Sequence, residues 1–77
     1  MPLPLKSGKS VVKILVKDFG FVSVRQKGSH IVLSKRVGDH KIVTVVPDHR
    51  QVQRGTLRSI LKLANVSEED FSKTSRR

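Results

Sequence analysis

The chain has 77 residues and a formal net charge of +10 at pH 7, with sixteen Lys and Arg against six Asp and Glu. This length gives one small domain over residues 1–77, and it excludes an enzyme that encloses a large substrate beneath a lid. Cysteine is absent, which excludes a disulfide scaffold and a thiolate zinc site. Because no apolar run approaches the roughly 18 residues of a membrane span, and residues 1–5 are too short and proline-rich for a signal peptide, we expect a cytoplasmic protein with no membrane partner.

Most of the basic residues precede residue 67, whereas half of the acidic residues follow it. A surface of this kind binds polyanions, because lysine and arginine gain affinity by releasing counterions from a phosphate backbone. Only three aromatic residues are present, Phe19, Phe21 and Phe71. They are too few to build both a core and a platform on which bases stack, so we expect recognition through backbone and shape.

A helix is the first predicted element. It begins at the capping hydroxyls of residues 7–10 and ends at Gly20. Its apolar residues recur at helical spacing, at Val12, Leu15, Val16 and Phe19. Its other face carries three cations, Lys9, Lys13 and Lys17.

Three strands follow as an antiparallel meander. Residues 21–27 and 30–34 are rich in β-branched side chains, and Gly28-Ser29 between them suits a two-residue hairpin turn. A second turn over residues 35–40 leads to a strand over 41–46, which Pro47 ends. Alternation along the middle strand predicts Ile31 and Leu33 in the core and His30 on the opposite, open face, and Phe21 is a candidate to turn inward.

Two helices are predicted after a polar loop over residues 47–53. The first has an apolar stripe and an opposite basic side, and it ends at Asn65; the stripe is Leu57, Ile60, Leu61 and Ala64, and the basic side is Arg54, Arg58 and Lys62. Ser67 caps a short third helix with acidic residues in its first turn, and Phe71 packs back on the domain. We expect residues 73–77 to form a frayed tail.

The order α-β-β-β-α with a short extra C-terminal helix predicts an α+β fold. The helices cover one face of a three-stranded antiparallel sheet, and the other face stays open to solvent.

One stretch of six residues, 25–30, combines features suited to a phosphodiester. Arg25 and Lys27 precede the Gly28-Ser29 turn, and His30 follows it at once. An imidazole exchanges protons near neutrality, so it acts as acid or base without a metal. Gly28 also lets the backbone approach a ligand with no side chain in the way.

Four segments together resemble the HicA-type toxins, the small mRNA interferases that are partnered by HicB antitoxins. The segments are Leu5-x-Ser7-Gly8, Gly20-Phe21-x-x-x-Arg25-Gln26-Lys27-Gly28-Ser29-His30, Val45-Val46-Pro47-x-His49, and Gly55-Thr56-Leu57-Arg58-Ser59-Ile60-Leu61 followed by Glu68-Glu69-x-Phe71. They span nearly the whole chain. The resemblance implies a fold similar to double-stranded-RNA-binding domains and a toxin that cleaves mRNA.

The resemblance also implies that His30 is the catalytic residue and that an acidic HicB-type antitoxin covers the basic surface. We expect no cofactor and no metal, because cysteine is absent and the six acidic residues include no pair suited to hold Mg²⁺ against a phosphate. Cleavage of RNA without a metal needs a base for the 2′-hydroxyl, a cation for the phosphorane charge and an acid for the leaving oxygen. Arg25 and Lys27 are candidates for the cation, and the sequence does not identify a second acid or base. The candidate RNA-binding residues are Arg25, Lys27, Gly28, Ser29, His49, Arg54 and Arg58.

Simpler interpretations stay open at several of these positions. His49 fits loop packing as well as RNA contact, Arg54 and Arg58 fit a solvated helix face, and His40 is expected to be a surface residue of a turn. For the whole chain, the alternative function is a non-catalytic basic RNA-binding module, in which His30 is incidental.

Overall fold

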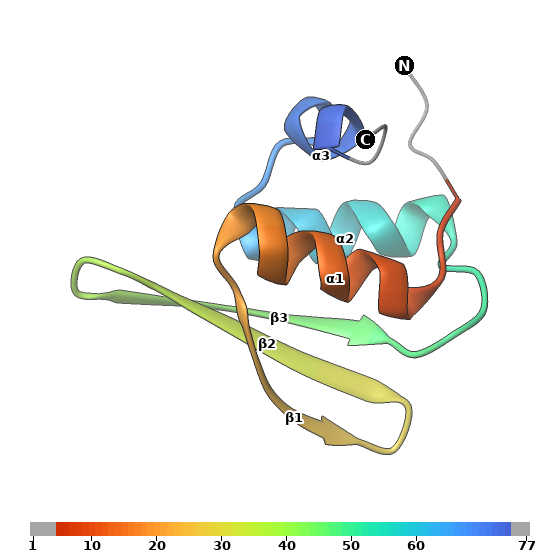
Figure 1. Ribbon diagram of the computed structural model, residues 1–77, viewed down its shortest axis with the longest axis horizontal. Coiled ribbons are helices and arrows are strands. Elements are labelled where there is room, and N and C mark those ends of the chain that lie inside the picture. Colours follow the sequence, from red (N-terminus) through yellow and green to blue (C-terminus); the bar gives the residue numbers. More distant parts are fainter. Residues whose placement is uncertain (1–4, 75–77) are drawn as a thin grey trace.

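The computed structural model describes residues 5–74 and has the predicted order of elements (Figure 1). These are α1 (Gly8–Phe19), β1 (Val22–Lys27), β2 (His30–Val37), β3 (His40–Pro47), α2 (Arg54–Ala64) and α3 (Glu68–Thr74). The strands form one antiparallel sheet in the order β1-β2-β3. The predicted α+β fold with a short extra C-terminal helix is therefore confirmed.

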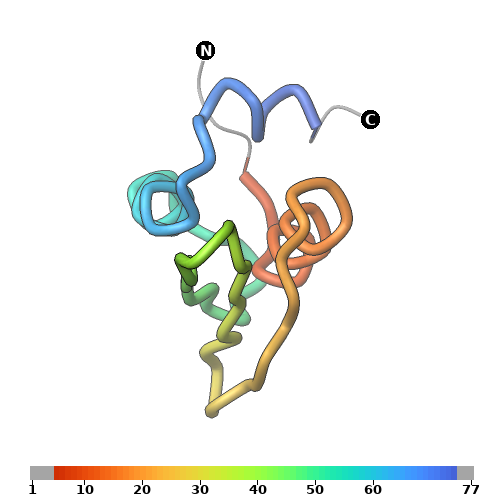
Figure 2. Tube along the Cα trace, turned by 90° about the vertical axis from the view of Figure 1, so that its left-hand side faces the viewer, coloured from red at the N-terminus to blue at the C-terminus, as the bar shows by residue number. Residues whose placement is uncertain are grey.

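The molecule is built in layers (Figure 2). Helices α1 and α2 lie side by side on one face of the sheet, and α3 lies on the side of these helices that is turned away from the strands. No helix within residues 5–74 combines the length and the apolar character needed to cross a membrane. Within residues 5–74, no helix covers the second face of the sheet, which is left open (Figure 1).

The core lies between the sheet and the helices. Its buried apolar residues come from every layer: Val11, Leu15, Phe21, Ile31, Leu33, Val46, Val52, Leu57, Ile60, Leu61, Ala64 and Phe71. Ile31 and Leu33 are in the core as predicted, and Phe21 is turned inward with 2% of its surface exposed. The hydroxyl of Thr44, fully buried among them, donates a hydrogen bond to the Ile60 carbonyl at 2.9 Å and so joins β3 to α2.

The rotation of α1 differs from the sequence prediction. Gly8, Val11 and Leu15 face the core, whereas Val16, which was placed on the apolar stripe, is 40% exposed. The reason is a close approach at the start of the helix. A side chain on Gly8 would collide with the carbonyl oxygen of Pro47, so this glycine lets the helix backbone rest directly on the end of β3.

The helix ends follow the predicted capping chemistry. Ser7 accepts a hydrogen bond from the Ser10 N–H at 3.1 Å, and Ser67 accepts one from the Asp70 N–H at 3.0 Å. Gly20 and Asn65 both adopt the left-handed conformation that ends a helix, with φ of 77° and 60°.

Two predicted segments have different bounds in the structure. The second turn is confined to two residues, so β2 continues to Val37 and β3 begins at His40, and residues 35–37 pair with 40–42. The frayed tail predicted over residues 73–77 is wrong at its start. Helix α3 includes Lys73 and Thr74, with Lys73 Nζ 3.4 Å from Glu69 Oε1, while residues 75–77 lie outside the described part.

An irregularity divides β1 into two parts whose side chains alternate out of step with each other. Val22 pairs with Ser34 and Ser23 with Leu33, but the register then shifts, so that Arg25 pairs with Val32 and Lys27 with His30. The extra residue is a β-bulge at Val24, and it reverses the alternation of the residues that follow.

Candidate active site

His30 is the first residue of β2 and lies directly after the turn at residues 28 and 29. It pairs with Lys27 on β1 and with Pro47 on β3. Opposed residues of an antiparallel sheet project from the same face, and residues two apart on a strand also share a face. His30 and Val32 therefore lie on the open face, and His30 is exposed, as the sequence predicted.

The two nearest cations of the sequence motif share this face with His30. Counted from the two-residue turn, Lys27 lies opposite His30 itself and Arg25 lies opposite Val32, and both cationic side chains are exposed. An anion that contacts the imidazole on the open face consequently meets positive charge from β1.

The turn itself is tied to the end of β3. The Ser29 carbonyl accepts a hydrogen bond from the Asp48 N–H at 2.6 Å. Gln26 Nε2 donates to the Gly28 carbonyl at 3.1 Å and to Asp48 Oδ2 at 3.3 Å. Gly28 has φ of 60°, and a methyl group in its place would meet no atom within 4 Å. The surface above the turn is therefore open.

His30 also lines a hollow of about 440 Å³, named here the histidine hollow, where the end of the sheet meets the loop after β3 and the start of α2. Its walls are His30, Val45, Pro47, His49, Val52, Gln53 and Thr56. The volume is within the range of sites that take a group the size of a nucleotide. The hollow thus brings together two histidines from distant parts of the sequence.

The loop that carries His49 is held on both sides by backbone hydrogen bonds. The His49 carbonyl accepts from the Gly8 N–H at 2.8 Å, and the Val52 N–H donates to the Lys6 carbonyl at 2.7 Å. These bonds use the main chain only. Among residues 5–74, the imidazoles of His30 and His49 make no hydrogen bond or ion pair, so their nitrogens stay available to a ligand.

Two other candidate residues lie away from the hollow. Arg54 begins α2 without lining the hollow, and Arg58 is one turn further on. Arg58 Nε lies 3.3 Å from Glu68 Oε1, an exposed ion pair that contributes little to stability. Gln53 and Thr56, which do line the hollow, were not among the predicted site residues. They lie at the N-cap and in the first turn of α2. Because the short loop after β3 brings this end of α2 close to the end of β3, their position at the start of the predicted helix could have indicated them.

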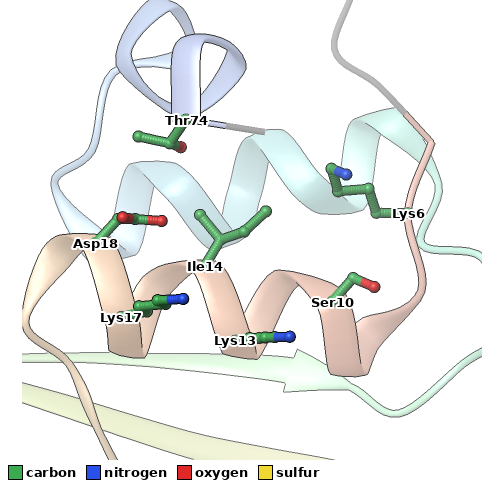
Figure 3. Close-up of a pocket in the computed structure, with 7 residues that line it drawn as sticks. All are labelled: Lys6, Ser10, Lys13, Ile14, Lys17, Asp18 and Thr74. Atoms are coloured by element: carbon green, nitrogen blue, oxygen red, sulfur yellow. The ribbon is translucent and has the colours of Figure 1, made fainter. Parts of the chain in front are cut away.

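The remaining histidine and a second hollow are elsewhere in the molecule. His40 begins β3 and pairs with Val37, at the opposite end of the β2–β3 pair from His30, which pairs with Pro47. A hollow of about 440 Å³ between α1 and α3 is lined by Lys6, Ser10, Lys13, Ile14, Lys17, Asp18 and Thr74 (Figure 3). This second hollow adds positive charge but contains no imidazole. Within residues 5–74, no group of three His, Asp or Glu side chains is placed to hold a metal ion.

The chain matches a protein-family model. The model described as the HicA toxin of bacterial toxin-antitoxin systems covers residues 8–66, from the first residue of α1 to just beyond α2. The chain belongs to the HicA toxin family. It is accordingly the toxin of a toxin–antitoxin pair. The matched region contains the whole sheet and every residue that lines the histidine hollow. No protein in a search of curated sequences matches this HicA-family chain.

Proposed function

We propose that this HicA-family toxin is an endoribonuclease that cleaves mRNA in the cytoplasm without a metal ion, with His30 as its catalytic residue. The observation that carries the proposal is the placement of His30. Its imidazole is exposed on the open face, with Lys27 directly opposite it and the unobstructed turn at Gly28 beside it.

The chemistry is transfer of the phosphodiester to the neighbouring 2′-oxygen. His30 either accepts the proton of the 2′-hydroxyl, which makes that oxygen nucleophilic, or donates a proton to the leaving oxygen. Lys27 and Arg25 stabilise the additional negative charge that the phosphorus bears in the transition state. A single proton-transferring group contributes about 10² to 10⁴ to the rate, and correct placement of the phosphodiester adds to this.

RNA binding is assigned to the positive surface around the turn. Arg25, Lys27, Gly28 and Ser29 hold the backbone next to His30, and His49 contacts it across the histidine hollow. Arg54 and Arg58 extend the positive surface along α2. Arg58 leaves its ion pair with Glu68 when it contacts a phosphate. Contacts of this kind fix the register of the RNA without reading its bases.

The protein partner is proposed to be an acidic HicB-type antitoxin that covers the positive surface and His30. A toxin with a net charge of +10 is inhibited most directly by a protein that competes with RNA for the same cations. RNA binding by the toxin–antitoxin complex tests this point. A complex that binds RNA as tightly as the free toxin would show that inhibition does not occur by occlusion.

The decisive test of the enzymatic proposal is His30→Ala, with His40→Ala as the matched control. Truncating an exposed side chain at the start of a strand creates no core cavity, so both variants should unfold at temperatures close to that of the wild type. His30→Ala should lower the cleavage rate by about 10² to 10⁴ at nearly unchanged RNA affinity, and His40→Ala should cleave normally. A folded His30→Ala protein that cleaves at the wild-type rate would refute the assignment.

The same assay addresses the alternative function. The positive charge and the scarcity of aromatic residues also suit a basic module that binds RNA through its backbone. In that case the purified wild-type protein binds RNA with strong salt dependence and leaves it intact.

A further inference from the structure

We propose that His49 is the second proton-transferring residue of RNA cleavage and acts with His30 across the histidine hollow. This inference rests on the proposed endoribonuclease function and adds to it the group that a single histidine leaves unassigned.

The reaction moves two protons at two different oxygen atoms. One residue removes the proton of the 2′-hydroxyl as the 2′-oxygen forms its bond to phosphorus. The other residue donates a proton to the 5′-oxygen as the bond between phosphorus and that oxygen breaks. The products are a 2′,3′-cyclic phosphate and a free 5′-hydroxyl, and the two residues end with their protonation states interchanged. Proton exchange with water restores both, so no further reactant is needed.

The hollow places two imidazoles around one space that a nucleotide fits. His30 comes from the start of β2 and His49 from the loop after β3, and both residues line the hollow. The hydrogen bond from the Gly8 N–H to the His49 carbonyl, together with the contact of Gly8 on Pro47, holds the backbone of His49 in place. Two proton-transferring groups that line one hollow can act on the two oxygen atoms of a phosphodiester bound there.

No other residue that lines the hollow provides this chemistry. Val45, Pro47 and Val52 are apolar, and the side chains of Gln53 and Thr56 do not exchange protons near neutrality. Each imidazole also has charged neighbours: Lys27 lies opposite His30, and Asp48 and Arg50 flank His49 in the sequence, with Asp48 held by Gln26. These groups supply fixed charge, and His49 is left as the proton-transferring partner.

The first test is kinetic and uses His49→Gln and His49→Ala. Both variants remove proton transfer, but glutamine keeps the size of the side chain and its ability to form hydrogen bonds. Both should lower kcat by about 10² to 10⁴ with KM changed only a few-fold, and one limb of a bell-shaped pH–rate profile should disappear. His40→Gln serves as the control and should retain the wild-type profile. A His49→Gln protein with wild-type kcat, or with only a raised KM, would show that His49 merely binds RNA and would overturn the proposal.

The second test separates the acid from the base. It uses an RNA substrate in which sulfur replaces the bridging 5′-oxygen, because a thiolate leaves without receiving a proton. If the two histidines divide the reaction, this substrate should restore cleavage by one of the two variants, His30→Ala or His49→Ala, and not by the other. Restoration of neither variant would overturn the division of roles. Absence of cleavage by the wild type on both substrates is a separate result, which would refute the endoribonuclease itself and the present inference with it.

Discussion

Gly28→Ala and Gly38→Ala form a matched pair that separates the role of the turn in folding from its role in RNA cleavage. The two glycines occupy the two hairpin turns of the sheet with nearly the same backbone angle, φ of 60° and 59°. At both positions an added methyl group meets no atom within 4 Å, so steric collision is absent and only backbone strain remains. This strain costs about 1–2 kcal/mol in the left-handed region. The reduced freedom of the unfolded chain offsets about 0.4–1 kcal/mol of it.

The net loss of stability is therefore about 1 kcal/mol for either variant, which lowers Tm by about 4–8 °C for a domain of this size. Both proteins stay folded at 25 °C, where cleavage is measured. Only Gly28 lies beside His30, and a methyl group there stands where the RNA backbone approaches. A displacement of about 1 Å costs about 10²-fold in rate, so Gly28→Ala should cleave far more slowly than Gly38→Ala. Equal cleavage rates at equal Tm would refute the claim that RNA passes over this turn.

Three further predictions concern charge, the core and metal ions. Lys27→Ala should weaken RNA binding and lower the magnitude of the slope of log K against log salt by about 0.7–0.9, whereas the control Lys73→Ala, at a cation paired with Glu69 in α3, should leave the slope unchanged. An unchanged slope for Lys27→Ala would show that Lys27 does not contact RNA. Thr44→Val removes the buried hydrogen bond to the Ile60 carbonyl and should lower the free energy of unfolding by about 0.5–1.5 kcal/mol, while the folded protein still cleaves RNA. An unchanged Tm would mean that this bond contributes no net stability. Cleavage should persist in excess EDTA, because side chains move the protons; a loss of activity that Mg²⁺ reverses would contradict this mechanism.

The features that follow a single local periodicity were predictable from the sequence. Alternation along β2 separates Ile31 and Leu33 from His30 without reference to any other element, and the spacing of three and four residues on α2 identifies its buried stripe. The capping residues are equally local, because Ser67 and Asn65 act on backbone groups within a few positions of themselves.

The features that depend on contacts between elements were not predictable in this way. The rotation of α1 is decided by the approach of Gly8 to Pro47, which are distant in the sequence. The extent of β2 beyond residue 34 depends on its pairing with β3 across the short turn. His30 and His49 share one hollow only because β3 returns antiparallel to β2 and ends beside its first residue. Periodicity within one segment does not indicate which residues of two distant segments come together.

The bulge at Val24 lets the start and the end of one strand face opposite sides of the sheet. Ser23 pairs with Leu33 before the bulge and Arg25 pairs with Val32 after it, so two residues that are two positions apart project from opposite faces. In a regular strand that kept Lys27 opposite His30, Phe21 would share the open face with the cations and leave the core, where it is now 2% exposed. The one extra residue therefore allows the same short segment to fill the core at its start and to carry positive charge on the open face at its end.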